Sequence, residues 1–229
     1  MEKIRLVVAT QKSREDFFKS TATGRSIILY YPLIPNVEIR LFEENKKGLP
    51  EVYNIAIAES VNSPAILIFL HDDMHILDYY WQNQVRISLQ HFEIVGLAGN
   101  QRRVFKQPSW AFIDDKFTRD KSENLSGIVG NGSSFPPGNL SIFGPPGREV
   151  KLLDGIMLIV RSTTLISNDI QFDERFDFHF YDMDFCRQAE EKKIKMGTWA
   201  ISTIHESEGF CGTEEWKVAY KKYLEKWQG

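Results

Sequence analysis

The chain has 229 residues and a formal net charge of −3, which favours a single domain over residues 1–229 and argues against a nucleic-acid partner, because such partners require many Lys and Arg side chains. Hydrophobic residues make up 42% of the chain, but no apolar run approaches the roughly 20 residues that span a bilayer, and no secretory signal is present. We therefore expect a packed protein of the cytoplasm without a transmembrane segment, in which Cys186 and Cys211 stay reduced.

Strand and helix patterns alternate in the first part of the sequence. Ile4–Ala9 and Val37–Phe42 are apolar or β-branched runs that end in polar residues, which is typical of buried parallel strands. After Pro50, apolar residues recur at helical spacing as far as about Ser60. Ala65–Leu70 is the most apolar run of the chain and predicts a central strand.

The alternation continues beyond the central strand. Asp78 is placed to cap a helix whose apolar residues run from Trp81 to Phe92, and Ile94–Ala98 predicts the next strand. Strands that alternate with helices are joined by right-handed crossovers. The pattern therefore predicts an α/β fold with a mostly parallel sheet flanked by helices.

Residues 99–148 are rich in Gly, Pro, Ser and Asn, and we predict a long loop there, at about 100–148. The loop is either functional or a surface insertion, and the composition does not decide between these alternatives. Strands are predicted at Val150–Leu153, Ile156–Arg161 and Thr198–Ile204. A helix is predicted over Asp182–Lys193, with Gly197 just past its end.

The tripeptide His71-Asp72-Asp73 directly follows the central strand, at the sheet edge where open α/β folds bind ligands. Adjacent acids repel each other, and a divalent cation such as Mg²⁺ or Mn²⁺ offsets that repulsion. Two alternatives remain open. One acid could cap the following helix, or His71, Asp73 and His75 could face one way as a zinc site.

Two further groups could carry chemistry. Asp182 and Asp184 open the late helix among Phe180 and Tyr181, where an apolar wall could raise a carboxyl pKa towards that of a general base. The helix dipole alone also favours acids at this position. His205 follows the last predicted strand and is either structural or a ligand that completes a metal site.

Five of these segments, in this order, resemble a GT-A glycosyltransferase. The similarity is narrower to the family-2-like group that includes the StrF domain of streptomycin biosynthesis. It covers almost the whole chain and is weakest between residues 99 and 148. The segments that carry it are Gly48–Ala58, Ile66–Asp73, Leu153–Gly155, Tyr181–Phe185 and His205–Gly209.

The resemblance implies a metal-dependent transfer of a sugar from a nucleotide-sugar donor, most readily a UDP-sugar, to a saccharide or other hydroxyl acceptor. In that family the acids of the DXD-type motif bind the metal, Mn²⁺ or Mg²⁺, which assigns Asp73 to the ion and Asp72 to the ion or the ribose. His205 matches a histidine that reaches the same ion or the diphosphate. His71 departs from the family pattern, because an acid usually stands there.

The remaining roles follow from the same resemblance. Thr10, Glu43 and Asn54 match positions that hold the base and ribose of the nucleotide. Asp154 matches a residue that contacts the sugar or the acceptor. Asp182 matches the catalytic base, with Asp184 as its helper, and this arrangement implies inversion at the anomeric carbon.

Two alternatives accompany this interpretation. The replacement of an acid by His71 keeps open a catalytically inactive domain that binds sugar nucleotides or serves as a scaffold. At the C-terminus an aromatic stripe either covers the core or makes a peripheral membrane contact. The stripe consists of Trp216, Tyr220, Tyr223 and Trp227.

Overall fold

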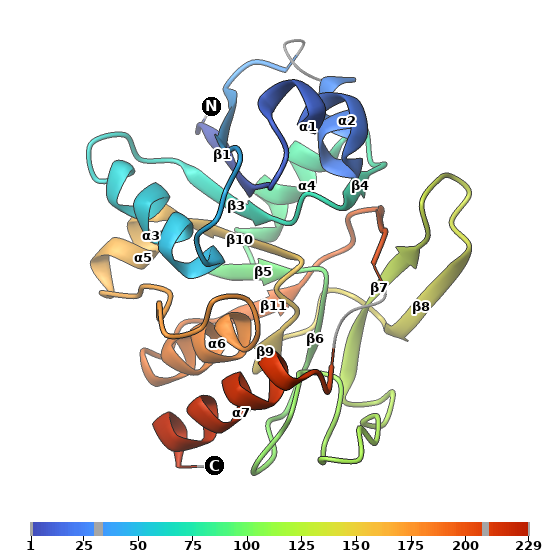
Figure 1. Ribbon diagram of the computed structural model, residues 1–229, viewed down its shortest axis with the longest axis vertical. Helices are drawn as coiled ribbons and strands as arrows, with labels where there is room; N and C mark the ends of the chain where they lie inside the picture. Colours follow the sequence, from blue (N-terminus) through green and yellow to red (C-terminus); the bar gives the residue numbers. More distant parts are fainter. Residues whose placement is uncertain (1, 30–33, 208–210, 229) are drawn as a thin grey trace.

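The computed structural model describes residues 2–29, 34–207 and 211–228, which form two sheets and the helices around them (Figure 1). The strands of the first sheet are β1 (Ile4–Ala9), β2 (Val37–Phe42), β3 (Ile66–Leu70), β5 (Ile94–Gly96), β10 (Met157–Arg161) and β11 (Met196–Thr198). The strands of the second are β4 (Met74–Ile76), β6 (Ala98–Asn100), β7 (Leu125–Asn131), β8 (Asn139–Gly144), β9 (Leu152–Leu153) and β12 (Thr203–His205). The helices are α1 (Arg14–Ser20), α2 (Ala22–Ile28), α3 (Leu49–Glu59), α4 (Trp81–Ser88), α5 (Ser162–Ser167), α6 (Tyr181–Glu191) and α7 (Glu214–Trp227).

The first sheet has the order β11-β5-β10-β3-β1-β2, and its pairs are parallel except that β10 runs antiparallel to both of its neighbours. All five residues of β3 are buried, as a central strand covered on both faces requires. In Figure 1 the helices α3, α5 and α6 group on one side of the molecule, and α7 lies beside α6. The predicted α/β class with a mostly parallel, helix-flanked sheet is confirmed.

The second sheet was not predicted. Its order is β4-β12-β7-β6-β9, with β8 paired to β7, and only the β7–β12 pair is parallel. The chain passes from the first sheet to the second along β5–β6, and again along β11–β12. For this reason the strands predicted at Ile94–Ala98 and Thr198–Ile204 are each divided in two. The C-terminal ends of these runs therefore lie in a different sheet from their beginnings.

The prediction of a structureless loop at about 100–148 was wrong for its second half. Strands β7 and β8 form an antiparallel hairpin there, which extends from the body of the molecule on the side away from α3 and α5 (Figure 1). Glycines weaken the strand pattern of this hairpin in the sequence. The backbone conformation of the hairpin nevertheless requires one of them. Gly127 has a φ of +112°, and a side chain there would collide with the backbone of Leu97 on the adjacent segment.

Two predicted helix ends also differ. Asp78 is not the N-cap of α4, because Tyr80 holds that position and the Asp78 carboxylate instead accepts from the Tyr80 amide at 2.7 Å. Helix α6 ends at Glu191, and Lys193 then adopts a left-handed conformation with a φ of +58°. Gly197 does not follow the helix but lies in β11, where the ring of Phe92 leaves no room for a side chain.

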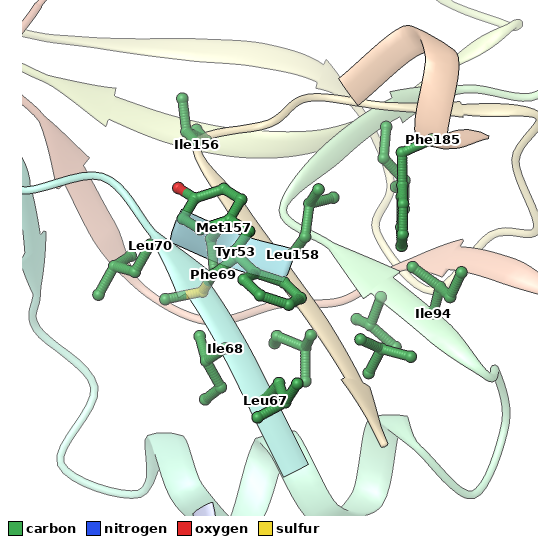
Figure 2. Close-up of a cluster of buried hydrophobic side chains, with 14 of the residues drawn as sticks. Tyr53, Leu67, Ile68, Phe69, Leu70, Ile94, Ile156, Met157, Leu158 and Phe185 are labelled. Carbon is green, nitrogen blue, oxygen red and sulfur yellow. The ribbon is translucent and has the colours of Figure 1, made fainter. Parts of the chain in front are cut away.

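The core lies between the first sheet and its helices, and Figure 2 shows the part of it around β3 and β10. Tyr53 of α3 packs on Phe69 of β3, with ring centroids 4.7 Å apart, and Phe172 stacks on Phe185 of α6 at 4.4 Å. These aromatic contacts fix α3 and α6 relative to the central strand. They therefore also fix the residues that follow β3 and open α6.

Candidate active site

Three side chains that can bind a metal meet at the junction of the two sheets. His71 and Asp73 follow β3, and His205 ends β12. One ligand atom from each lies within 4.8 Å of the others, so this group could hold a metal ion. Asp73 Oδ2 is 3.3 Å from His205 Nε2. The other oxygen of Asp73, Oδ1, is buried and has no hydrogen-bond partner within the described residues. A buried oxygen without a partner fits a carboxylate that binds a cation.

Backbone contacts hold this group in place. The amide of Glu206 donates to the Asp73 carbonyl at 3.0 Å, which ties the end of β12 to the turn after β3. From α2, the Thr23 hydroxyl contacts the carbonyls of His71 and Met74 at 2.6 and 2.9 Å. The cluster is therefore formed by the fold itself, before any ligand binds.

The electrostatics of Asp73 and His71 suit a cation. Burial would raise the pKa of Asp73, but the hydrogen bond and charge of His205 outweigh burial and lower that pKa to about 2. Burial lowers the pKa of His71 to about 4. At neutral pH, Asp73 is thus ionised and His71 is a neutral imidazole, which are the forms that bind metals.

Two acids lie beside the metal-binding cluster. Asp182, in the first turn of α6, accepts from the Gly155 amide at 3.1 Å and from the Met183 amide at 2.8 Å. Burial, followed by the charge of Asp154, raises the pKa of Asp182 to about 7, and burial also raises the pKa of Asp154. A carboxylate with a pKa near neutrality can take and release a proton at physiological pH, as a general base must.

Tyr181 and Gly155 link Asp182 to the metal-binding cluster. Its buried hydroxyl is 2.8 Å from His71 Nε2 and 2.8 Å from the carbonyl oxygen of Gly155. Gly155 is required at its position, since a side chain there would collide with this hydroxyl. Residues from β3, β12, α6 and the β9–β10 turn therefore form one continuous site.

Asp72 and Thr10 contact each other instead of the metal-binding cluster. The Thr10 hydroxyl donates to Asp72 Oδ2 at 2.6 Å, and burial raises the pKa of Asp72. Asp72, predicted as a second metal ligand or a ribose ligand, is thus not in the group that could hold a metal, and His71 takes its place there. His75 also lies outside the group, because it contacts Glu206 at 3.1 Å.

Two predicted nucleotide ligands, Asn54 and Glu43, make hydrogen bonds within the protein. Asn54 uses both amide protons on the carbonyl of Phe172 and the carboxylate of Glu174, and its oxygen accepts from the Phe172 amide. This placement makes Asn54 a link between α3 and the 172–174 segment and argues against a contact with nucleotide. Glu43 accepts from the Arg14 amide at 2.8 Å. It also lines a groove of about 570 Å³ at the end of β2, away from the metal-binding cluster.

The structure argues against the predicted helper role of Asp184. Two residues along a helix correspond to a rotation of about 200°, so Asp184 faces away from Asp182. Its side chain is fully buried and contacts Lys226, Trp227 and Gln188 at 2.6, 2.8 and 2.7 Å. Asp184 therefore anchors α7 to α6.

Helix α7 also packs against Phe180, the residue that precedes α6. Phe180 has a φ of +67°, which is costly for a residue with a side chain. Its ring packs on Trp216, Tyr220 and Tyr223 of α7, at centroid distances of 5.2, 5.4 and 5.2 Å. Trp216 and Tyr223 are buried, so the interpretation of the C-terminal stripe as a cover for the core is confirmed for these residues.

Sequence reasoning missed two contributions to the site. It treated His71 as a departure from the motif and did not link it to Tyr181, because 110 positions separate the two residues and no local pattern connects them.

Part of the last motif, Glu208 and Gly209, lies outside the described residues. Among the described residues, no helix is both long enough and apolar enough to cross a membrane.

Comparisons with solved structures find proteins with a similar fold. The catalytic domain of Drosophila beta1,4-galactosyltransferase 7, crystallised with xylobiose, is 8% identical, covers 96% of this chain and 80% of its own, and superposes with a TM-score of 0.54. Residues 1–349 of TarS from S. aureus, in complex with UDP-GlcNAc, are 11% identical, cover 94% of this chain and give a TM-score of 0.50. The chain spans 60% of that TarS fragment.

These identities are low, and the similarity shows a GT-A-like fold and nothing finer. No family model matches the sequence. No curated protein matches it by sequence either. The narrower resemblance to the StrF domain group stays a prediction.

Proposed function

We propose that the chain is a metal-dependent glycosyltransferase that moves a sugar from a nucleotide-sugar donor to an acceptor hydroxyl. The observation that carries this proposal is the juxtaposition of Asp182 with the metal-binding cluster. One carboxylate with a pKa of about 7 lies beside a His-Asp-His group. The Tyr181 hydroxyl links His71 to Gly155, whose amide donates to Asp182. The GT-A-like fold supports it, since two solved structures of similar fold, TarS and the galactosyltransferase domain, are glycosyltransferases.

Each part of the site has a role in this reaction. A divalent ion, when bound, neutralises the negative charge that develops on the leaving diphosphate. His71, Asp73 and His205 hold that ion. Asp182 accepts the proton of the attacking hydroxyl, a step typically worth about 10²–10⁴ in rate. Attack from the face opposite the leaving group gives inversion, as the family resemblance implies.

A UDP-sugar is the donor we favour, and the complex of TarS with UDP-GlcNAc supports this choice. The acceptor is a hydroxyl compound, for which a saccharide such as the xylobiose of the galactosyltransferase complex is a starting model. The alternative of an inactive binding domain rested on the loss of an acid at His71. That argument is weakened, because His71 itself belongs to the group that could hold the metal.

Calorimetric titration tests the donor site. UDP, GDP, dTDP and CDP are each titrated with Mn²⁺ and with EDTA, first into the natural protein and then into Asp73→Ala. We expect UDP to bind with Mn²⁺ only, and Asp73→Ala to abolish that binding. Asp78→Ala is the matched control, since this acid lies on the same segment but outside the cluster. Failure of every nucleotide to bind would contradict the proposed function.

Catalysis is tested separately. Release of nucleotide from the donor is followed in the presence of a panel of saccharide acceptors, and the anomeric configuration of the product is read by proton NMR. We expect inversion, and we expect Asp182→Asn to bind nucleotide but to release almost none. A product with retained configuration would contradict the role given to Asp182.

A further inference from the structure

The hairpin formed by β7 and β8 begins beside the metal-binding cluster. His205, the last residue of β12, pairs in register with Asn131 at the end of β7. The Gly132 amide also donates to the His205 carbonyl at 3.1 Å. Residues that pair in register on neighbouring strands point to the same face of a sheet. The side chains of Asn131 and His205 therefore share one face, which we call the inner face of the hairpin.

The inner face carries neutral polar side chains. Asn131 donates from its amide nitrogen to Asn139 Oδ1 and to Ser141 Oγ of β8, each at 2.9 Å. Among the described residues, the Asn139 amide group and the Ser141 hydroxyl proton have no acceptor. Neither strand of the hairpin contains a charged residue. The inner face therefore offers hydrogen bonds to a neutral ligand that is rich in hydroxyl groups.

The outer face of the same hairpin has the opposite character. Ile128, Leu140 and Ile142 alternate with the polar residues and are 43%, 58% and 63% exposed. Ser141, in contrast, lies on the inner face and is half-buried. Antiparallel sheets with one covered face usually bury their apolar residues and expose their polar ones. The reversed pattern indicates that the polar side chains of the inner face serve a ligand.

Aromatic side chains border the inner face on the side of the two acids. Phe143, two positions after Ser141, packs edge-on against Trp110, with ring centroids 4.7 Å apart. Burial raises the pKa of Asp154, and a hydrogen bond from the Trp110 side chain opposes that rise, so the indole lies beside this carboxylate. Binding sites for small molecules combine such apolar walls with a few polar groups. The inner face is thus continuous with the candidate active site.

We propose that the inner face of the hairpin binds the acceptor, and that this acceptor is a neutral oligosaccharide of at least two sugar units. His205, Asn131 and Asn139 lie on three adjacent strands, so the row that they form spans about 10 Å. Two linked sugar rings span such a row, whereas one ring does not. Asn139 and Ser141 then contact the second sugar unit and determine acceptor specificity.

This inference rests on the proposed function, because it names the substrate that receives the sugar. Saccharide binding is measured apart from nucleotide binding, so the two can fail separately. If UDP binds and no saccharide does, the inference is wrong and the donor site remains. If a saccharide binds to the inner face and no nucleotide binds, the proposed function is wrong and the saccharide site remains.

Saturation-transfer NMR measures saccharide binding, both without nucleotide and with UDP and Mn²⁺. The probes are three pairs: xylose with xylobiose, glucose with cellobiose, and N-acetylglucosamine with diacetylchitobiose. We expect at least one disaccharide to bind about tenfold more tightly than its monosaccharide, as two added neutral hydrogen bonds allow. Binding of no probe under either condition, or equal affinity within every pair, would overturn the proposal.

The double variant Asn139→Ala, Ser141→Ala removes both free donors. We expect it to bind the preferred disaccharide about 10-fold more weakly and the monosaccharide as before. Leu140→Ala is the matched control, because Leu140 lies between the two positions on the outer face, and its affinities should not change. Circular dichroism and the melting temperature show whether both variants are folded. A folded double variant with the natural affinity for the disaccharide would contradict the role of the inner face.

Steady-state kinetics with the preferred disaccharide separate acceptor binding from the rest of the reaction. In the double variant we expect the acceptor KM to rise about 10-fold, while the donor KM and kcat stay as in the natural protein. A purely structural defect would change the donor KM and kcat as well. An unchanged acceptor KM, or an equal rise in both KM values, would overturn the proposal.

Discussion

Replacing Asp182 with Asn is expected to stabilise the fold, and to do so more strongly as the pH rises. Burial and the charge of Asp154 raise the pKa of Asp182 to about 7, compared with about 3.9 for an unfolded chain. An acid with a raised folded-state pKa holds its proton more tightly when folded, so its ionisation costs stability. That cost grows from about pH 4 and is complete above about pH 7. Three pKa units correspond to about 4 kcal/mol.

The pH dependence of the stability gained by Asp182→Asn separates the effect of the Asp182 charge from the other effects of the substitution. Asn cannot accept from both the Gly155 and Met183 amides, and the lost hydrogen bond costs about 1 kcal/mol at any pH. The charge term, in contrast, changes by about 2–3 kcal/mol between about pH 5 and about pH 8. The difference between the two gains therefore isolates the ionisation of Asp182.

Urea unfolding of the natural protein and Asp182→Asn, in EDTA at both pH values, measures this difference. Asp184→Asn is the control. It lies on the same helix turn but faces Lys226 and Trp227, and we expect it to lower the free energy of unfolding at both pH values. If the Asp182→Asn gain is the same at both pH values, Asp182 titrates normally, and the raised pKa that supports its role as a base is wrong.

Further predictions concern activity and local packing. Asp182→Asn should lose about 10²–10⁴-fold in transfer rate, measured as nucleotide release, while its Mn²⁺ affinity stays unchanged. Asp184→Asn should lower the free energy of unfolding, measured in urea, by about 2–3 kcal/mol, because it weakens the buried pairing with Lys226. The folded variant should keep its transfer activity. A folded but inactive variant would support the helper role of Asp184. Gly155→Ala should displace the Tyr181 hydroxyl and weaken Mn²⁺ binding, measured by EPR; unchanged affinity would contradict the link between Tyr181 and the metal-binding cluster.

The first sheet was predictable because its signals are local. The five apolar residues of β3 are buried on both faces, and a run of that kind is visible in the sequence. The acids after it were placed correctly at the sheet edge for the same reason. The second sheet has strands of two or three residues, such as β9 and β12, whose pairing comes from neighbours far along the chain. Short strands of this kind depend on context more than on propensity.

Side-chain direction was the part of the site that sequence patterns could not supply. Asp182 and Asp184 look alike as acids at a helix start, yet one faces the site and the other faces α7. Only the docking of α7 tells them apart, and that helix begins 30 residues later. The contacts of Asn54 were unpredictable for a similar reason, since its partners lie 118 or more positions away in the sequence.

His71, in place of an acid, lowers the negative charge that the site offers to a divalent ion. A third carboxylate beside Asp72 and Asp73 would add repulsion, whereas neutral His71 adds none, and Asp73 is paired with His205 without an ion. The protein thus offers a divalent ion a single negative ligand. Under the proposed function, the rest of the neutralising charge comes from the donor diphosphate. Ion and donor then strengthen each other's binding by the same factor, because such coupling is reciprocal.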